Sequence, residues 1–581
     1  MTLVEALELL KREQRLDLAA RNILLACGFT PLHLKTFLAA ELTSRIPDRR
    51  IEIATGLFGD VAGSISSARA GQSDAIAVFL EWQDLDPRLG LRTLGGWKVR
   101  DLADIVASAR RKLELISSAI EAAASHSVVV CSLPGLPLPP LFFTPGAYSS
   151  PQEMEIRKAV ADCAATLAQT PGIRLLRSQT IDQLSPLAER FDAKTEIDLG
   201  FPYRLPHAAA LAALGAELIA TRPPKKGIIT DLDDTFWSGI LGEAGVAGVC
   251  WDLDRRAQAH GIYQQFLESL ASAGVLVAVA SKNDADLVAA ALRREDLLCR
   301  ESSLFPVEAH WGPKSESVRR ILKAWNIAPD AVLFIDDSPM EAAEVKAAFP
   351  EIETLQFPGK DVRALWTMLE RLRDLFGKPA IHDEDELRLA SLRDSAILSA
   401  AENGAGTAAL DDFLRDADAR IEFSTEDSSD ARTFELVNKT NQFNLNGRRW
   451  DRADWQRLLN LPGATLISVS YRDKYGSLGK IAALAGVRNG RSAHVSAWVM
   501  SCRAFSRRIE HQCLKYLFDR FELDEIVLDY TPTPRNGPAT DFLAAMVGAA
   551  PEGTISVTRE QFEQAAPPLF HTVEERQPAL S

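Results

Sequence analysis

The chain has 581 residues, of which 46% are apolar and 25% are charged, and its formal net charge is -14. One hydrophobic core rarely exceeds about 250–300 residues, so a chain of this length should divide into about three domains. The acidic balance, without a long run of lysine or arginine, argues against nucleic acid and against an anionic membrane surface as partners.

The sequence shows neither a targeting signal nor a cysteine framework. Residues 1–15 predict an amphipathic helix of acidic and basic residues without the apolar centre of a signal peptide. No apolar run approaches the roughly 18 residues of a membrane span. The seven cysteines are odd in number and lack a C-x-x-C pair, which is typical of reduced thiols. We therefore expect a cytoplasmic protein.

Residues 1–221 alternate apolar runs with helical stretches. The runs lie at 23–27, 51–54, 75–80, 128–131 and 173–176. This alternation predicts βαβ units on a mostly parallel, doubly wound sheet. This pattern resembles an SGNH-hydrolase-like domain, in which a Gly-Asp-Ser at the end of the first strand supplies the nucleophile. Here Cys27-Gly28-Phe29-Thr30 stands at that place and no serine follows. Cys27 and Thr30 are the candidate nucleophiles, and spacing identifies no histidine–aspartate partner for them. We read His207 as a packing or capping residue and expect a domain without catalytic activity.

An acidic turn follows the short apolar run 227–230: Asp231-Leu-Asp-Asp-Thr235. Residues i and i+2 of a strand point to the same side, so Asp231 and Asp233 should lie together at the carboxyl end of a buried strand. Carboxylates held that close need a cation or a shared proton. The pair suits phosphoryl transfer in which one aspartate attacks phosphorus, the other moves a proton and Mg²⁺ balances the charge.

Three later segments place polar side chains at the ends of predicted elements: Ser281-Lys282-Asn283 after the apolar run 275–280, Lys314 before a helix over 315–325, and Asp336-Asp337 after the apolar run 331–335. Ligands of open parallel sheets bind at the carboxyl ends of the strands. Mg²⁺ prefers carboxylate oxygens, and a lysine ammonium suits a phosphate. We therefore predict one phosphate and metal site at this edge.

The order Asp-x-Asp-x-Thr, Ser, Lys, Asp-Asp resembles the haloacid dehalogenase (HAD) superfamily of phosphotransferases. The resemblance implies that Asp231 is the nucleophile, Asp233 the general acid/base and Lys314 the residue that balances their charge. It further implies phosphate or substrate contacts by Thr235, Ser281, Lys282 and Asn283. The implied Mg²⁺ ligands are Asp231, Asp233, Asp336 and Asp337.

Longer phrases are similar to the FkbH-like branch of that superfamily, subfamily IIIC. They are Asp231 to Glu243, Ser281 to Asn283, Trp311 to Glu316, Phe334 to Pro339 and Asn438 to Asn444. Characterised relatives take the glyceryl group of 1,3-bisphosphoglycerate, remove its phosphates and load the unit on the phosphopantetheine thiol of an acyl carrier protein. The resemblance thus implies a phosphorylated small-molecule substrate and a carrier-protein partner. A plain phosphatase and a carrier-binding scaffold are the alternatives.

Two positions depart from the pattern of that branch. Asp234 stands where asparagine is usual, which adds a charge beside the metal. Ala280 stands where glyceryl-transferring relatives have a cysteine proposed to hold the glyceryl thioester, and a methyl group is no nucleophile. Direct transfer to the carrier thiol and simple hydrolysis are both compatible with Ala280. The short spacings from 235 to 281 and from 281 to 314 leave no room for a sizeable cap domain, so the site should open towards large partners.

The sequence divides at Pro223-Pro224, with a HAD-like catalytic domain over 222–358. A charged helical connector is predicted over 359–415, with a flexible patch near 404–407. Residues 416–581 predict an α+β domain with a helix over 431–437, strands over 464–471, 481–487 and 493–500, a helix over 505–521, a strand over 525–530 and a last helix from 539.

This order resembles the acetyltransferase (GNAT-like) fold. Its pyrophosphate loop would be Arg503 to Arg508, which lacks both glycines that allow close backbone approach, so acetyl-CoA is not expected there. A groove for the phosphopantetheine arm of a carrier would survive. Arg503, Arg507 and Arg508 would form a docking patch or a solvated helix face. Asn438, Asn441 and Asn444 would line a turn or make local capping bonds.

Overall fold

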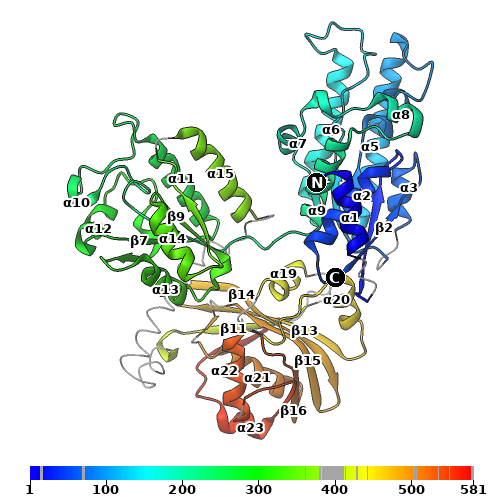
Figure 1. The fold of residues 1–581 in the computed structure, drawn as a ribbon. Helices are drawn as coiled ribbons and strands as arrows, with labels where there is room; N and C mark the ends of the chain where they lie inside the picture. The colour runs from blue at the N-terminus through cyan, green and yellow to red at the C-terminus, as the bar shows by residue number, and fades with distance from the viewer. Residues whose placement is uncertain are drawn as a thin grey trace. The chain divides into compact units, whose positions relative to one another are not determined.

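A computed structural model shows the fold (Figure 1). It describes residues 1–13, 17–68, 72–359, 361–378, 381, 411, 414–426, 430–440, 443–474, 476–501, 504–505, 507–533, 536–548 and 550–576. The chain forms two compact units, one of residues 1–222 with 451–454 and one of 223–450 with 455–581. The predicted patch at 404–407, most of the connector, Asn441 and Arg503 lie outside the described residues.

The first unit contains a parallel five-stranded sheet in the order β2-β1-β3-β4-β5. All five predicted strands are present: β1 Ala20–Ala26, β2 Arg50–Thr55, β3 Ala75–Phe79, β4 Val128–Ser132 and β5 Ile173–Leu175. The helices are α1 Leu3–Arg12, α2 Leu32–Arg45, α3 Val61–Ser66, α4 Trp82–Leu85, α5 Leu102–Ala124, α6 Pro151–Gln169, α7 Ser178–Leu184, α8 Ala193–Leu199 and α9 Leu205–Ile219. The chain runs outward from β1 to β2 and then crosses back to β3, so the order reverses between β1 and β3.

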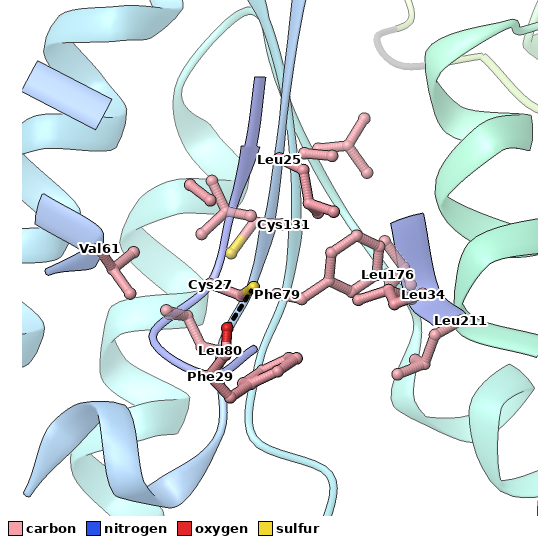
Figure 2. Packing of buried hydrophobic residues seen from close by; sticks show 14 of the residues in the cluster. Leu25, Cys27, Phe29, Leu34, Val61, Phe79, Leu80, Cys131, Leu176 and Leu211 are labelled. Atoms are coloured by element: carbon pink, nitrogen blue, oxygen red, sulfur yellow. Dashed lines mark hydrogen bonds between the residues drawn. The ribbon is translucent and has the colours of Figure 1, made fainter. Parts of the chain in front are cut away.

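The core of this unit surrounds the carboxyl ends of β1 and β3. Cys27, directly after β1, lies among apolar side chains that include Phe79 and Cys131, as Figure 2 shows. Its thiol donates a hydrogen bond to the Phe29 carbonyl at 3.3 Å. Burial raises the pKa of Cys27 well above its usual value. A neutral, buried thiol is a poor nucleophile.

The second unit contains another parallel five-stranded sheet, in the order β10-β9-β6-β7-β8. Its strands are β6 Gly227–Thr230, β7 Leu276–Ser281, β8 Leu304–Ala309, β9 Val332–Asp336 and β10 Glu353–Gln356. Its helices are α10 Leu241–Ala244, α11 Gln258–Ser272, α12 Ala285–Leu292, α13 Lys314–Trp325, α14 Pro339–Ala348 and α15 Val362–Phe376. The strands predicted at 227–230, 275–280 and 331–335 are confirmed as β6, β7 and β9, and the helix predicted over 315–325 is confirmed as α13. All of 223–359 is described, and short elements join the strands without a cap domain.

Alternate residues of these strands face two different helix layers, as expected for a strand buried on both sides. Ile228, Val277 and Leu333 belong to a core with α11 and α15. Their neighbours Ile229 and Ala278 belong to a core with α13 and α14. The result is a three-layer α/β sandwich.

Helix α15 corrects the expected end of this domain. Its residues Leu365, Leu372 and Phe376 are buried in the same core as α11. A border at 358 would cut this helix from the sheet that it covers, so we propose a border after 378.

The remaining part of the second unit has a mixed sheet in the order β17-β16-β15-β14-β13-β11-β18, with β12 paired to β15. The strands are β11 Arg420–Thr425, β12 Phe443–Asn444, β13 Ala464–Asp473, β14 Gly476–Asn489, β15 Ser492–Met500, β16 Glu525–Asp529, β17 Thr554–Thr558 and β18 Thr572–Arg576. The helices include α19 Ala431–Lys439, α20 Arg452–Leu459, α21 Ile509–Arg520, α22 Gly537–Val547 and α23 Arg559–Ala565.

The helix expected from 539 is present as α22, but it is not the last element, because β17, α23 and β18 follow it. The sequence of strand β18, Thr-Val-Glu-Glu-Arg, has no apolar alternation. The strand forms because it pairs with β11, which is distant in the sequence. Such a strand is set by its partner rather than by its own sequence. Among the described helices none is both long enough and apolar enough to cross a membrane.

Candidate functional site

Two aspartates meet where the neighbouring strands β6 and β9 end. Thr230 pairs with Ile335, and the Asp231 amide donates to the Ile335 carbonyl at 2.9 Å. The next residues, Asp231 and Asp336, therefore lie side by side at the carboxyl edge. Asp336 also accepts from the Ser338 amide at 2.9 Å, which fixes its carboxylate at the start of α14.

Lys314 joins these aspartates from the first residue of α13. Its Nζ lies 2.8 Å from Asp231 Oδ1 and 2.5 Å from Asp336 Oδ2, and it also contacts the Glu341 carboxylate. Lys314 is 1% exposed. Buried charges persist only when they are paired, and here one ammonium serves three carboxylates.

Burial and the Lys314 charge have opposite effects on the pKa values of the aspartates in this cluster. Burial raises the pKa of Asp231 to about 7, while Lys314 acts to lower it. The pKa of Asp336 is raised by burial in the same way. Burial alone would lower the pKa of Lys314, but Asp231 and Asp336 raise it above its usual value. Additional positive charge would keep both aspartates ionised.

The oxygens of Asp231, Asp336 and Glu341 lie within 4.8 Å of one another. Three carboxylates beside two lysine ammoniums, Lys314 and Lys282, leave one negative charge unbalanced, and hard carboxylate oxygens are what Mg²⁺ prefers. This donor set fits the expected ion. It includes Glu341, which the sequence reading missed, and it does not include the side chains of Asp233 and Asp337. One sequence signal could have identified Glu341. Ser338-Pro339 predicts the start of a helix, and Glu341 lies in the first turn of that helix.

Asp233 is held beside the cluster by three donors. Its Oδ1 accepts from the Trp237 indole at 3.0 Å and from the Leu241 amide at 3.1 Å. Its Oδ2 accepts from the Asn283 amide group at 3.0 Å, and the same nitrogen donates to Ser281 Oγ at 3.0 Å. The Ser-Lys-Asn segment after β7 thus orients the second aspartate of the acidic turn.

Lys282 and Glu341 form a second ion pair at this edge. Lys282 Nζ lies 2.9 Å from Glu341 Oε1, and the other Glu341 oxygen contacts Lys314. One carboxylate therefore connects both lysines. Lys282 is partly exposed while Lys314 is buried, so Lys282 is the lysine that an incoming phosphate would meet first.

Thr235 was expected to contact substrate, but its side chain is 0% exposed. Its Oγ1 accepts from the Asp337 amide at 3.0 Å and donates to an Asp337 carboxylate oxygen at 3.4 Å. A side chain without exposed surface has no access to a substrate. The contact that the structure supports is therefore between Thr235 and Asp337, which ties the acidic turn to the end of β9.

Asp234 adopts a left-handed backbone with φ of 49°, a conformation that asparagine and aspartate tolerate better than most residues. Its Oδ1 accepts from the Gly239 amide at 2.8 Å. An asparagine oxygen would make the same bond, so the turn is retained with aspartate. Burial, and then the nearby Asp234 charge, raise the pKa of Asp337.

Ala280 is 0% exposed and belongs to the core between the sheet and helices α13 and α14. Ser281, one residue later, is the first side chain of β7 that bonds within the site. The methyl group of Ala280 therefore packs against apolar neighbours and reaches no substrate.

The proposed arginine patch is not a free surface. Arg507 is 2% exposed and lies near Asp473, while Arg508 pairs with Asp411 at 2.5 Å and donates to the Pro568 carbonyl at 2.8 Å. Solvent and partners cannot reach Arg507. The asparagines make local bonds: Asn444 Oδ1 accepts from Gly447 N at 2.9 Å, and Asn438 Oδ1 accepts from Trp450 N at 2.8 Å.

The gap between β15 and β16 is filled by the chain itself. These parallel strands pair only as far as Val495 and Leu528. Beyond that point the Leu445 amide donates to the Trp498 carbonyl at 2.9 Å, and its carbonyl accepts from the Thr531 amide at 3.1 Å. A phosphopantetheine arm in this gap would have to displace that segment.

Histidine 207 has the packing role expected of it. Its Nδ1 lies 2.9 Å from Ser185 Oγ, and its ring packs edge-on against Tyr203 at 5.0 Å. Burial lowers the pKa of His207 to about 3, so the ring is neutral. Neither contact involves Cys27 or Thr30.

Comparison with known proteins shows the fold. No family model matches the chain, and no curated protein matches it. The N-terminal part of a Bacteroides fragilis protein, which contains a phosphatase domain and was solved with Mg, aligns over its whole length and over 65% of this chain, with a TM-score of 0.50 and 18% identity. A candidate GDSL-like lipase from Parabacteroides merdae covers 35% of this chain and aligns over 98% of its own, with a TM-score of 0.23 and 12% identity. A salicylyl-acyltransferase from a tetracycline biosynthetic pathway covers 34% of this chain and 51% of its own, with a TM-score of 0.19 and 13% identity.

The class defined by this fold is α/β. A Rossmann-type parallel sheet without a large cap within residues 223–359 is preceded by a second helix-covered parallel sheet and followed by an α+β part. The fold class expected from the sequence is confirmed.

Proposed function

We propose that this chain is a Mg²⁺-dependent enzyme of the HAD type, similar to the FkbH-like branch. It would dephosphorylate a small acyl or glyceryl phosphate through an aspartyl-phosphate and deliver the carbon unit to an acyl carrier protein. The observation that carries the proposal is the buried contact of Lys314 with both Asp231 and Asp336. The phosphatase domain and the Mg of the Bacteroides fragilis structure support the same chemistry.

In the proposed reaction, a carboxylate oxygen of Asp231 attacks phosphorus and the bond from phosphorus to the leaving oxygen breaks. Asp233 gives that oxygen a proton and later accepts one from the water that attacks the phosphoenzyme, which releases inorganic phosphate and restores Asp231. Asn283 and Trp237 keep Asp233 in place for both transfers. Mg²⁺ held by Asp231 and Asp336 would supply positive charge against the phosphoryl group.

Delivery of the carbon unit to an acyl carrier protein needs a different bond change. The carrier thiol must lose its proton and attack the acyl carbonyl carbon, and phosphate must leave from that carbon. Attack by Asp231 on the phosphorus of an acyl phosphate would instead leave an unactivated carboxylate. We therefore assign Asp231 to the phosphate ester of the unit and place acyl transfer outside the phosphoenzyme cycle.

Plain phosphate hydrolysis is the second candidate, and Ala280 favours it. The position of the thioester cysteine holds a buried methyl group, so transfer would have to proceed directly to the carrier thiol. The third alternative is a carrier-binding scaffold without activity, and the clustered carboxylates of Asp231, Asp336 and Glu341 favour an enzyme over it.

The test incubates the protein with Mg²⁺, 1,3-bisphosphoglycerate and a holo carrier protein, and reads phosphate release and the intact mass of the carrier. We expect phosphate and a glyceryl mass increment from the wild type. With Asp231→Asn we expect an increment that still carries the ester phosphate, because acyl transfer lies outside the phosphoenzyme cycle. Phosphate release without carrier loading would select plain hydrolysis. Loading of a unit that has lost its ester phosphate in Asp231→Asn would overturn the proposed role of Asp231.

A further inference from the structure

A pocket opens at the carboxyl edge of the sheet in the first unit. It is lined by the loops after β3 and β4 and by the segment before α9, and its volume is about 220 Å³. Ligands of open α/β sheets bind outside the carboxyl ends of the strands. The pocket lies at that edge, beside the ends of β3 and β4, in a domain whose sequence offers no catalytic set.

The walls of the pocket are mainly apolar. They include Trp82, Leu89, Leu136, Leu138, Pro139 and Pro202. An apolar cavity of about 150 Å³ holds a benzene molecule. This pocket would therefore hold an apolar group about one and a half times as large as benzene. A hexanoyl chain or a single substituted ring has such dimensions.

The polar groups of the pocket are used by the protein itself. Glu81 accepts from the Tyr203 hydroxyl at 2.9 Å and from the amides of Gly135 and Leu136 at 3.2 and 3.1 Å. Glu196 Oε1 accepts from the Leu91 amide at 3.1 Å. Burial raises the pKa of both glutamates. The chemistry of the pocket selects an apolar ligand.

The loop that closes the pocket continues into an exposed segment with a charge opposite to that of the chain. Residues 92–100 carry the exposed cations Arg92, Lys98 and Arg100, while the whole chain has a net charge of -14. The segment also exposes apolar surface, with Leu94 90% exposed. The Trp97 indole donates to the Arg88 carbonyl at 2.8 Å, so the segment has a defined shape.

We propose that this edge binds the acyl group of an acidic carrier protein, with the acyl chain in the pocket and the carrier against residues 92–100. The identity of the carrier as partner rests on the proposed function, whereas the apolar ligand follows from the pocket alone. Complementary charge would speed association and make it sensitive to salt. The first unit would thus hold the acyl end of the partner without reacting with it.

The test uses the full chain and calorimetry with two probes: hexanoyl-N-acetylcysteamine, and an acidic carrier protein with a hexanoyl group on its phosphopantetheine arm. We expect both to bind, and the carrier to bind at least about tenfold more tightly at low salt. Leu91→Trp would fill the pocket and weaken both probes more than about tenfold. Leu115→Trp, an exposed position on α5, would change neither.

Charge reversal separates the carrier contact from the pocket. Lys98→Glu should weaken the carrier about fivefold or more and leave the thioester unchanged, whereas Arg111→Glu on α5 should alter neither. Failure of the thioester to bind at millimolar concentration, or binding that survives Leu91→Trp, would overturn the proposal. Phosphate release should be equal in all four variants; its absence in the wild type would count against the proposed function and not against acyl binding.

Discussion

The Lys314 ammonium lies 2.8 Å from the Asp231 carboxylate, in a position where lysine is 1% exposed. Residues 83 positions apart thus form one buried ion pair, which also draws in Asp336 and Glu341. The pair links the N-terminus of α13 to the carboxyl end of β6. Stability and the proposed chemistry therefore depend on the same contact.

Replacement of Lys314 by methionine should destabilise the protein by about 3–5 kcal/mol, because it leaves buried carboxylates without their partner. The measurement is urea unfolding in EDTA, so that no added cation compensates. Lys323→Met, on the exposed face of the same helix, is the matched control and should have little effect. Equal midpoints for the two variants would show that Lys314 is not the main counter-charge.

Asp231→Asn should abolish the phosphoenzyme, whereas Asp233→Asn should slow its turnover by about 10²–10⁴-fold, the usual contribution of a general acid or base. Rapid-quench measurements with p-nitrophenyl phosphate, a phosphate ester, distinguish the two steps. The exposed Asp254→Asn serves as the control. A normal burst of phosphoenzyme in Asp231→Asn would contradict the assignment of the nucleophile.

Glu341→Gln should weaken Mg²⁺ binding by about tenfold or more, since its carboxylate belongs to the clustered donor set and steadies both lysines. Calorimetric titration with MgCl₂ measures the effect. Glu351→Gln, on the exposed side after α14, should bind as the wild type does. If Asp337→Asn weakens binding more than Glu341→Gln, the ligand set expected from the sequence is the better one.

The free energy of unfolding should decrease as the pH rises, because Glu81 titrates. Burial raises the pKa of Glu81 to about 8 from 4.5, so the folded protein favours the neutral acid. Its contribution is fully present below pH of about 4.5 and is lost as the pH rises through about 8. Glu81→Gln should remove this part of the pH dependence, because its amide can face Tyr203 while its oxygen accepts from the backbone.

The measurement for Glu81 is urea unfolding of the full chain between about pH 5 and 8.5. Burial also raises the pKa of Asp84, to about 7. The Glu81→Gln variant should therefore keep a smaller dependence of its unfolding free energy on pH. The exposed Glu121→Gln is the control. Parallel curves for Glu81→Gln and the wild type would show that the carboxyl stays ionised through its three donors.

Ala280→Cys should not create a reactive thiol. Position 280 is fully buried between the sheet and two helices, and burial in apolar surroundings raises the pKa of a thiol. We expect no iodoacetamide labelling at this position in the native state, and no gain in carrier loading. Rapid labelling, read as a mass increment absent from the wild type, would mean that the strand end opens to solvent.

The sequence by itself determined the parallel strands and the order of their polar ends. The apolar runs before Asp231, Ser281 and Asp336 are short, continuous and followed by turn residues, so their positions follow from local pattern. Because parallel strands end at one edge, the same pattern brought these residues to one site. The absence of a cap followed from spacing alone.

Only the tertiary structure decided which side chains pair. The contacts of Glu341 with Lys314 and of Thr235 with Asp337 could not be predicted from the sequence. They depend on how β6, β9 and α14 are placed against one another rather than on spacing along the chain. Helix α15 and strand β18 likewise owe their place to the surfaces that they cover, which local sequence does not encode. The burial of Arg507, and the exposure of the basic residues at 92–100, are settled by packing in the same way.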